Sequence, residues 1–531
     1  MLILVAALII IVPLFLLTIL NMPANKGMAI SALIVVAASF LIWKMPADAI
    51  AASAIQGIHK TVTVLWILLG ALVLLNVLGL SGAVVRITQG FKRLTLDVRL
   101  QAVIIAWLFG GLIEGVSGFG TPAIVTAPLL IALGFTPIAA VALALIGDST
   151  AAIFGAVSTP INVGFSNLGL NGNMVRQIAT TVTTNDLFAG LFIPSIIAAI
   201  VVLVFGRNKS VKQVLEVLPW TLLIGLVYTL SALGFAQVLG PDFVSILSPI
   251  VGIAFSILTI RFKILIPKNA WRGASHEDPK IAVSFTEEKT GLTLLQAWSP
   301  YIVVVILLFA TRVVPIVQQI TQSLDLGLHD ILGFKGMSSD WQILYSPGTV
   351  LLVASLIALW TQKQPLNTFG RSTKIASQTI FGATGFTLVV TLIMVQVFSN
   401  SGINTADLTS MPTFIATAMA KSLAPAWLIV APALGEIGAL ITGSSTVSAL
   451  TFSPIQMSVA TQAGLSVPLI LGLQLIGGAA GNMIAIHNIV SVSAVVGLSG
   501  KEGQILRTTI APALLYVVLA GLGALIISGF M

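Results

Sequence analysis

The sequence predicts an all-α polytopic membrane protein with about 12 to 14 transmembrane helices and inverted repeats that contain broken helices or re-entrant hairpins. Of the 531 residues, 57% are hydrophobic and only 8% are charged, whereas a soluble domain carries about 25% charged residues. The mean hydropathy is +1.08, and apolar runs of roughly 20 residues, long enough to span a bilayer, recur along the chain. Because the chain has no cysteine, disulfides, zinc–thiolate sites, iron–sulfur clusters and cysteine nucleophiles are excluded.

Uninterrupted apolar runs predict the spanning helices in chain order. They lie near residues 1–20, 28–43, 62–80, 183–206, 217–239, 242–260, 299–316, 345–361, 377–397 and 508–530. No basic stretch precedes the first run, which therefore predicts a retained helix rather than a cleaved signal peptide. Two further regions, about 101–165 and 425–498, are apolar but interrupted by Gly, Pro, Ser and Thr. Each is expected to hold about two to four spans or partial spans.

The charged residues predict the orientation. The net charge of +8 arises from 25 Lys and Arg against 17 Asp and Glu, so binding to anionic lipid explains it without nucleic acid. The basic residues of five loops are Lys92, Arg93 and Arg99; Arg207, Lys209 and Lys212; Arg261, Lys263, Lys268, Arg272 and Lys280; Lys363, Arg371 and Lys374; and Lys501 and Arg507. Since cytoplasmic loops carry the excess of Lys and Arg, we expect all five loops to be cytoplasmic and both termini to face outward.

Two observations argue against an ATP-driven pump that carries its own motor. The longest predicted cytoplasmic stretch, 264–298, has roughly 35 residues, which is too short for a nucleotide-binding domain. The phosphate-binding pattern GxxxxGK[ST] does not occur in the sequence. A transporter of this composition is therefore expected to be driven by a gradient.

Two blocks of the sequence resemble each other at an offset of about 330 residues, which is typical of duplicated transporters. LIEG at 112–115 resembles LITG at 440–443, and LALIG at 143–147 resembles LQLIG at 473–477. The first block follows a predicted cytoplasmic loop and the second a predicted outer loop, so the copies are expected to be inverted. At this offset the matched pairs are Asp148 with Gly478, Ala152 with Asn482, and Ser158 with Asn488.

Each block contains a predicted helix break. EGVSGFGTP at 114–122 and TGSST at 442–446 are rich in Gly, Ser and Thr. Unpaired backbone groups at membrane depth are tolerated only where they are buried or line a polar cavity, and the N-terminus of a half-helix suits a carboxylate. We expect the two breaks to meet near the midplane around a small anion.

The candidate proton-coupling residues are the intramembrane carboxyl groups Glu114, Asp148 and Glu436, together with His487, which lies in an apolar run. Charges inside membrane segments are costly and therefore point to function or pairing. A carboxyl group in a low-dielectric cavity favours its neutral form, and histidine suits proton relay. The competing interpretation is that all four only form structural hydrogen bonds.

Hydroxyl, amide and glycine positions near the breaks are the candidate substrate-binding residues. They are Ser117, Gly118, Thr121, Ser149, Thr150, Ser444, Ser445, Thr446, Asn482 and Asn488, with Ser158 and Thr159 as further hydroxyl donors. Small polar residues also join membrane helices to one another, which is the competing interpretation. Neither block contains an arginine clamp, because Arg86 and Arg312 lie at segment ends, and this favours a small monocarboxylate over a dianion. No metal site and no cofactor are predicted.

Several motifs resemble the bacterial L-lactate permease family. They are LIEGVSGFGTP at 112–122, GDST at 147–150, FGAVSTP at 154–160, GNMI at 481–484 and HN at 487–488. The resemblance covers nearly the whole chain. It implies symport of L-lactate, and of D-lactate and glycolate, with protons across the inner membrane, and a fold similar to the ion transporter superfamily, in which a mobile transport domain moves against a scaffold.

On this basis the sequence divides into five parts. We expect N-terminal scaffold helices at 1–100, a first repeat core at 101–206, scaffold helices with the cytoplasmic loop at 207–400, a second repeat core at 401–500 and a C-terminal helix at 501–531. The predicted partners are a lactate-type or glycolate-type monocarboxylate, protons and membrane lipid. The sequence is also compatible with a homo-oligomer.

Two alternatives remain open at the level of sequence. Unwound Ser-rich and Thr-rich breaks also coordinate Na⁺, which would make the protein a sodium-coupled carboxylate transporter. GVSG at 115–118 matches the G-x-S-G around the serine of rhomboid-type intramembrane proteases, with His487 as the base. The duplicated blocks have no role in a protease, so the prediction is a transporter and not an enzyme.

Overall fold

The computed structural model describes residues 2–16, 20, 22, 24–92, 94–118, 120–272, 291–423, 426–498 and 501–530. The elements of the first half are α1 (Leu2–Ala6), α2 (Leu8–Leu14), α3 (Ala24–Leu41), α4 (Ala47–Leu80), α5 (Ala83–Lys92), α6 (Val98–Ala102), η2 (Val103–Phe109), α7 (Gly110–Ser117), α8 (Thr121–Ala132), α9 (Pro137–Gly147), η3 (Thr150–Phe154), α10 (Gly155–Asn162), α11 (Gly172–Asp186), η4 (Gly190–Phe192), α12 (Ile193–Leu203), α13 (Val211–Val238), η5 (Pro241–Phe243) and α14 (Val244–Arg261). Those of the second half are α15 (Leu294–Val313), α16 (Pro315–Gln322), η7 (Ile331–Gly333), α17 (Pro347–Thr361), α18 (Leu366–Thr379), η8 (Ile380–Thr384), α19 (Gly385–Ser399), α20 (Met411–Leu423), α21 (Trp427–Thr442), α22 (Ser445–Ala463), α23 (Val467–Ile484), α24 (Ile486–Val495) and α25 (Glu502–Ser528).

The described chain is helical, with two isolated β-bridges between 325–328 and 339–342. Seven described segments are long and apolar enough to cross a membrane, or up to ten if each of three bent helix pairs forms one span, and four shorter apolar helices accompany them. The bent pairs are α9 with η3 and α10, α11 with η4 and α12, and α18 with α19. The all-α polytopic class is thus confirmed.

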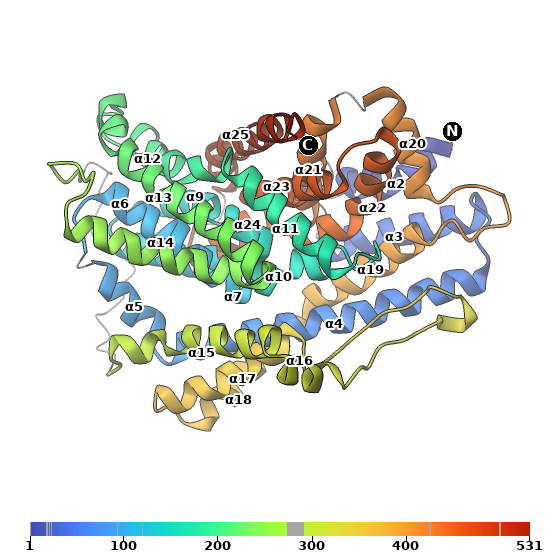
Figure 1. Cartoon of the computed structure of the whole chain (residues 1–531), viewed down its shortest axis with the longest axis horizontal. Coiled ribbons are helices and arrows are strands. Elements are labelled where there is room, and N and C mark those ends of the chain that lie inside the picture. Colours follow the sequence, from blue (N-terminus) through green and yellow to red (C-terminus); the bar gives the residue numbers. More distant parts are fainter. Residues whose placement is uncertain are drawn as a thin grey trace.

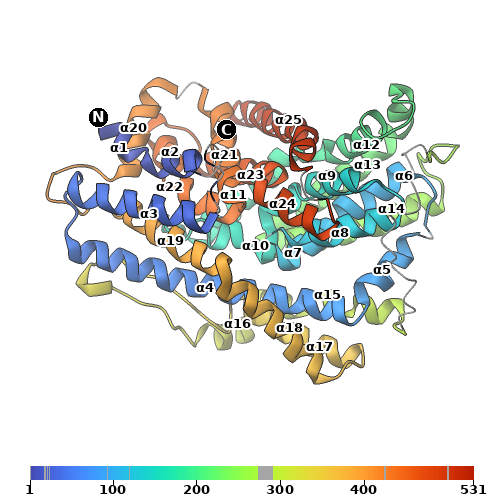
Figure 2. The same ribbon diagram turned by 180° about the vertical axis from the view of Figure 1, so that it is seen from behind.

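Two groups of helices form opposite sides of the molecule. Along one side, α4 packs against α3, α17, α18 and α19, and α15 packs against α5 and α17. On the other side, α21, α22 and α23 pack together and against α20 and α25. Figures 1 and 2 show both groups, with α7, α10 and α14 between them. The predicted division into scaffold and repeat cores stays a prediction.

The two predicted repeat cores are in direct contact. Helix α22 packs against α10, and α23 packs against η3 and α11. Each core contains two successive helix–break–helix units, α7–α8 and α9–α10 in the first and α21–α22 and α23–α24 in the second. This shared order agrees with the sequence similarity at the 330-residue offset, while the inverted relation stays a prediction.

Glycines allow α21 and α23 to touch through their backbones. A Cβ atom on Gly477 would lie 1.9 Å from the carbonyl oxygen of Pro432, and one on Gly481 would lie 2.4 Å from that of Glu436. A Cβ on Gly435 would lie 2.4 Å from the carbonyl oxygen of Gln474. Small residues at such positions are typical of helix pairs in membranes, where close packing replaces the hydrophobic effect as the stabilising force.

Four of the five basic loops lie at the same end of the molecule. Hydrogen bonds join them or the helix ends that flank them: Val98 to Trp271, Arg99 to Gln213, Arg86 to Leu292 and Gln362 to Gln296. This arrangement agrees with a common cytoplasmic side, which stays a prediction. Arg99 itself is not available to lipid, because it is fully buried and pairs with Asp97 at 2.6 Å.

Candidate functional site

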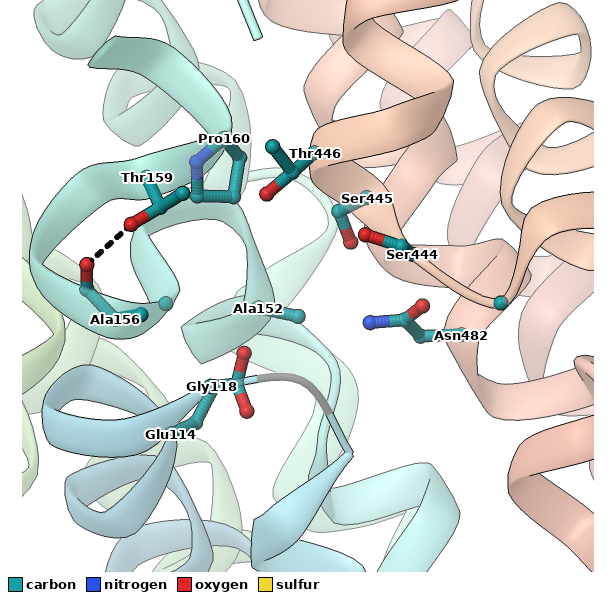
Figure 3. Close-up of a pocket in the computed structure, with 12 residues that line it drawn as sticks. Glu114, Gly118, Ala152, Ala156, Thr159, Pro160, Ser444, Ser445, Thr446 and Asn482 are labelled. Atoms are coloured by element: carbon teal, nitrogen blue, oxygen red, sulfur yellow. Dashed lines mark hydrogen bonds between the residues drawn. The ribbon is translucent and has the colours of Figure 1, made fainter. Parts of the chain in front are cut away.

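A small cavity, with about 20 Å³ of free space, lies between the two predicted repeat cores. Figure 3 shows side chains from the first core on one side of it and from the second core on the other. The lining residues are Glu114, Gly118, Ala152, Gly155, Ala156, Thr159, Pro160, Gly443, Ser444, Ser445, Thr446 and Asn482. About 10 to 15 Å³ of such space holds one water molecule, so the cavity is narrow in this conformation and has to widen before it takes a small carboxylate.

The first break, between α7 and α8, depends on glycine. Gly118 and Gly120 have φ angles of +60° and +75°, values that residues with a Cβ rarely adopt. Two hydroxyl groups stabilise this turn. Ser117 Oγ donates to the carbonyl of Ile113 at 2.9 Å, and Thr121 Oγ1 donates to the carbonyl of Gly118 at 2.8 Å. The two hydroxyl oxygens also lie 2.5 Å apart, and because each hydroxyl has a single proton, two of these three hydrogen bonds form at a time. Both hydroxyls serve the break itself.

The second break of the first core carries Asp148. The residue ends α9 with φ −83° and ψ 53°, outside helical geometry. Within α10, Ala156, Val157 and Ser158 have φ angles of 43°, 56° and 57°. A left-handed conformation costs a residue with a Cβ about 1 to 2 kcal/mol. This strained turn brings Ala156 to the cavity wall.

Glu114 and Asp148 form a buried pair of carboxyl groups. Their side chains are 3% and 2% exposed and are in hydrogen-bonding contact with each other. Glu114 Oε2 and Asp148 Oδ1 have no hydrogen-bond partner, and no ion pair of the described chain involves either residue. A Cβ on Gly155 would lie 2.1 Å from Glu114 Oε1, so the absence of a side chain there makes room for the carboxyl group.

The opposite wall is formed by the beginning of α22. Helix α21 ends at Thr442 and is followed by Gly443, which has a φ angle of +65°. Ser444 Oγ accepts a hydrogen bond from the backbone N–H of Val447 at 3.3 Å. The first residues of a helix leave N–H groups without partners inside the helix and carry a partial positive charge. Ser445 and Thr446 are these first residues and line the cavity. The N-terminus of a helix is a position that favours anions.

Asn482 completes the cavity from α23. Its Oδ1 has no partner, and its backbone carbonyl accepts from Asn488 Nδ2 at 3.3 Å. A Cβ on Gly120 would lie 3.2 Å from Asn488 Oδ1, so Asn488 connects the second core to the first break. Ala152 and Asn482, which the 330-residue offset matches, both line the cavity.

The cavity therefore brings together seven of the candidate residues. They are Glu114, Gly118, Thr159, Ser444, Ser445, Thr446 and Asn482. Ser117 and Thr121 stabilise the first break, Asp148 contacts Glu114, and Asn488 contacts Asn482. Ser149 is buried and does not line the cavity. Thr150 accepts from Trp107 Nε1 at 2.9 Å and does not line the cavity. Glu436 is 6% exposed and also lies outside the lining, and the side chain of His487 lies outside the described residues.

Comparison with known proteins identifies the family. The family model described as L-lactate permease matches residues 3–531. The chain belongs to the L-lactate permease family. It is 30% identical over 497 residues to the Putative L-lactate permease of Haemophilus influenzae, which covers 90% of this chain and 89% of the relative.

Two further relatives extend the range of this family. The L-lactate permease of Salmonella typhimurium is 26% identical over 519 residues, 92% of this chain and 89% of the relative. The Glycolate permease GlcA of Escherichia coli is 25% identical over 539 residues, 95% of this chain and 92% of the relative. All three relatives are named as permeases, and the chain with its apolar helices is a multi-pass membrane protein.

Sequence reasoning missed four positions of interest. Gly155, Ala156 and Pro160 line the cavity, but their glycine, alanine and proline side chains carry no chemical signal. Asp186 is a further buried carboxyl group, 3% exposed, at the bend between α11 and η4. It accepts a hydrogen bond from Tyr516 at 2.7 Å. The position of Asp186 inside the apolar run 183–206 was a signal that could have revealed it.

Proposed function

We propose that this protein is a secondary active transporter that carries L-lactate, D-lactate and glycolate together with protons across the inner membrane. The names of its relatives support lactate and glycolate as substrates. The observation that carries proton coupling is the Glu114–Asp148 pair beside the cavity. Two carboxyl groups in hydrogen-bonding contact have to share at least one proton, because two buried like charges repel each other strongly.

The cavity supports binding of a small carboxylate without a cation. Ser445 Oγ and Asn482 Oδ1 are buried and have no partner, and an unsatisfied buried polar group costs about 1 to 3 kcal/mol. A hydroxy acid offers groups that complement these atoms: its carboxylate accepts from Ser445 and from the N-terminus of α22, and its hydroxyl donates to Asn482. No Lys or Arg lines the cavity, which favours one negative charge over two.

In the proposed cycle, proton and anion neutralise each other. The carboxyl pair takes up a proton from outside, and the lactate anion then binds between the two breaks. The loaded site carries no added net charge, so its transfer across the membrane avoids the cost of moving an ion through a low-dielectric medium. The broken helices then re-expose the site to the cytoplasm, where anion and proton leave.

Uptake into proteoliposomes tests this function. With an acidic exterior, the wild type is expected to accumulate L-lactate above its equilibrium concentration. Glu114→Gln and Asp148→Asn each replace an ionisable group by a neutral one of similar shape. They are expected to lose accumulation driven by the pH gradient but to retain exchange of internal for external lactate. Asp407→Asn, in an exposed loop, is the matched control and is expected to behave as wild type.

Proton coupling through this pair is contradicted if both Glu114→Gln and Asp148→Asn still concentrate lactate as the wild type does, because the carboxyl pair then does not carry the proton. Removal of sodium at a fixed pH gradient separates the sodium-coupled alternative, because uptake then stops only if Na⁺ is the driving ion. Counterflow with L-lactate, D-lactate and glycolate measures the substrate range.

A further inference from the structure

A second and larger cavity lies directly beyond the first, at the other end of α10. We name it the vestibule; it has about 570 Å³ of free space and is lined by residues that include Lys60, Thr63, Asn162, Asp242, Arg312 and Asp340. Pro160 lines the smaller cavity, whereas Ile161 and Asn162 line the vestibule. A short helix therefore reaches from one cavity to the other.

The vestibule lies at the end of the molecule opposite the basic loops. Arg312 is in the last turn of α15, whose first residues are at the basic-loop end, and Asp242 precedes α14, which ends at Arg261 in a basic loop. The predicted orientation therefore makes the vestibule face outward. It is the side from which an imported anion arrives.

One of the two cations in the vestibule is already neutralised. Arg312 Nε donates to Asp242 Oδ2 at 2.7 Å, and its guanidinium group lies 3.8 Å from the ring centroid of Tyr345. Asp242 Oδ1 also accepts from Asn162 Nδ2 at 2.9 Å. This network fixes the end of α10, and Asp242 balances the charge of Arg312.

Lys60 has no such counterion. It is 6% exposed, and its ammonium group donates to Asn167 Oδ1, which also accepts from Gln396 Nε2 at 3.1 Å. No carboxylate of the described chain lies within 4.0 Å of Lys60 Nζ. Asp340 is the acidic residue that interacts electrostatically with Lys60. Its side chain is 78% exposed to solvent, which screens its charge, and its carboxylate lies 3.7 Å from the ring of His329.

A buried cation without a counterion is costly, and one anion would relieve that cost. An ammonium group has three donors, of which the contact with Asn167 uses one. The smaller cavity contains no cation and cannot by itself attract an anion from solution over distance, whereas a charge in a low-dielectric cleft raises the local concentration of the opposite charge.

We propose that the vestibule is a second anion site, in which Lys60 binds the carboxylate of a small monocarboxylic acid before the acid passes along α10 to the smaller cavity. This inference rests on the proposed transport function for the identity of the anion. In this proposal Lys60 binds the incoming anion, and the Glu114–Asp148 pair carries the proton.

The absence of native cysteines provides a test that does not depend on transport. Thr63→Cys introduces the sole thiol into the vestibule, one helical turn from Lys60. Its labelling rates with an anionic sulfonate and a cationic quaternary ammonium methanethiosulfonate reagent are compared. When Lys60→Gln is combined with Thr63→Cys, the labelling rate of the anionic reagent relative to that of the cationic reagent is expected to fall about tenfold. Lys335 is an exposed lysine at the same end, and combining Lys335→Gln with Thr63→Cys is expected to leave this ratio unchanged.

Transport kinetics then distinguish the two proposals. In otherwise unmodified protein, Lys60→Gln is expected to raise the KM for external L-lactate about tenfold with little change in the maximal rate, and Lys60→Arg is expected to restore it. An unchanged labelling ratio and KM in Lys60→Gln would overturn the anion site while lactate transport stands. If the labelling ratio responds but wild-type protein takes up no lactate, the anion site stands and the proposed substrate is wrong.

Discussion

Gly155 provides a direct test of the carboxyl site. Replacing it by alanine adds one methyl group, and the backbone tolerates the change because Gly155 has φ −61° and ψ 154°, which any residue adopts. The new Cβ would lie 2.1 Å from Glu114 Oε1 and 2.9 Å from Cδ. Real Cβ contacts essentially never fall below 3.0 Å, so the carboxyl group has to retreat by about 1 Å.

The size of the effect follows from this displacement. Glu114 is 3% exposed and in contact with Asp148, so its carboxyl group cannot retreat without disturbing the pair. A misplacement of about 1 Å in a functional site costs about 100-fold in rate. Gly155→Ala is therefore expected to lower the initial rate of lactate uptake driven by a pH gradient about 100-fold.

The assay is uptake of radiolabelled L-lactate into proteoliposomes that contain equal amounts of folded protein, with the melting temperature in detergent as the measure of folding. Gly172→Ala is the control, because a Cβ at Gly172 meets no atom within 4 Å, and it is expected to transport at the wild-type rate. Wild-type uptake by a correctly folded Gly155→Ala variant would refute the role assigned to the position of Glu114.

Three further changes test other parts of the structure. Asn482→Ala removes the polar side chain from the cavity and is expected to raise the KM for lactate about two- to tenfold, since one hydrogen bond contributes about 0.5 to 1.5 kcal/mol; initial uptake rates at a series of lactate concentrations measure it. Gly477→Ala places a Cβ 1.9 Å from the carbonyl of Pro432 and is expected to destabilise the protein by about 1 to 3 kcal/mol, seen as a lower melting temperature. Tyr516→Phe removes the 2.7 Å hydrogen bond to Asp186 and is expected to destabilise by about 1 to 3 kcal/mol, because a buried acceptor is left without its donor.

Each of these changes has a matched control. Asn173→Ala lies on the exposed face of α11 and is expected to keep the wild-type KM; an equal increase there would show that the effect of Asn482 is not local. Gly503→Ala meets no atom within 4 Å and is expected to keep the melting temperature. Tyr301→Phe removes a hydroxyl that has no hydrogen-bond partner, so a loss as large as that of Tyr516→Phe would contradict the hydrogen-bond argument.

The fold class could be predicted because the bilayer limits the choices. Backbone groups in lipid have to be paired, which allows helices and closed barrels. Apolar runs of about 20 residues, in a chain that is 57% hydrophobic, fit spanning helices and are too long for barrel strands of about 9 to 11 residues. The breaks at Gly118 and Gly443 were also predictable, because glycine and hydroxyl residues interrupt apolar runs there. The sequence could not reveal where helices bend without glycine, as at Ala156 to Ser158.

The site was predicted in part, and the reason lies in tertiary contacts. Residues at helix breaks, such as Glu114 and Ser445, carry a local signal and line the cavity. Thr150 follows Asp148 closely in sequence, but its hydroxyl accepts from Trp107 instead. Ala152 and Gly155 contribute because their small side chains leave space in the cavity. The sequence does not show this role, because it depends on which residues pack against them in the fold.

The contact between α21 and α23 limits how the second core can move. Where two helices meet backbone to backbone, no side chain separates them that could repack as one slides past the other. We expect these helices to travel as a single body during the transport cycle, with the bending confined to Gly443 and Ala485, where each one ends. Of these two bending positions, Gly443 lines the cavity, so bending there would also change the shape of the candidate binding site.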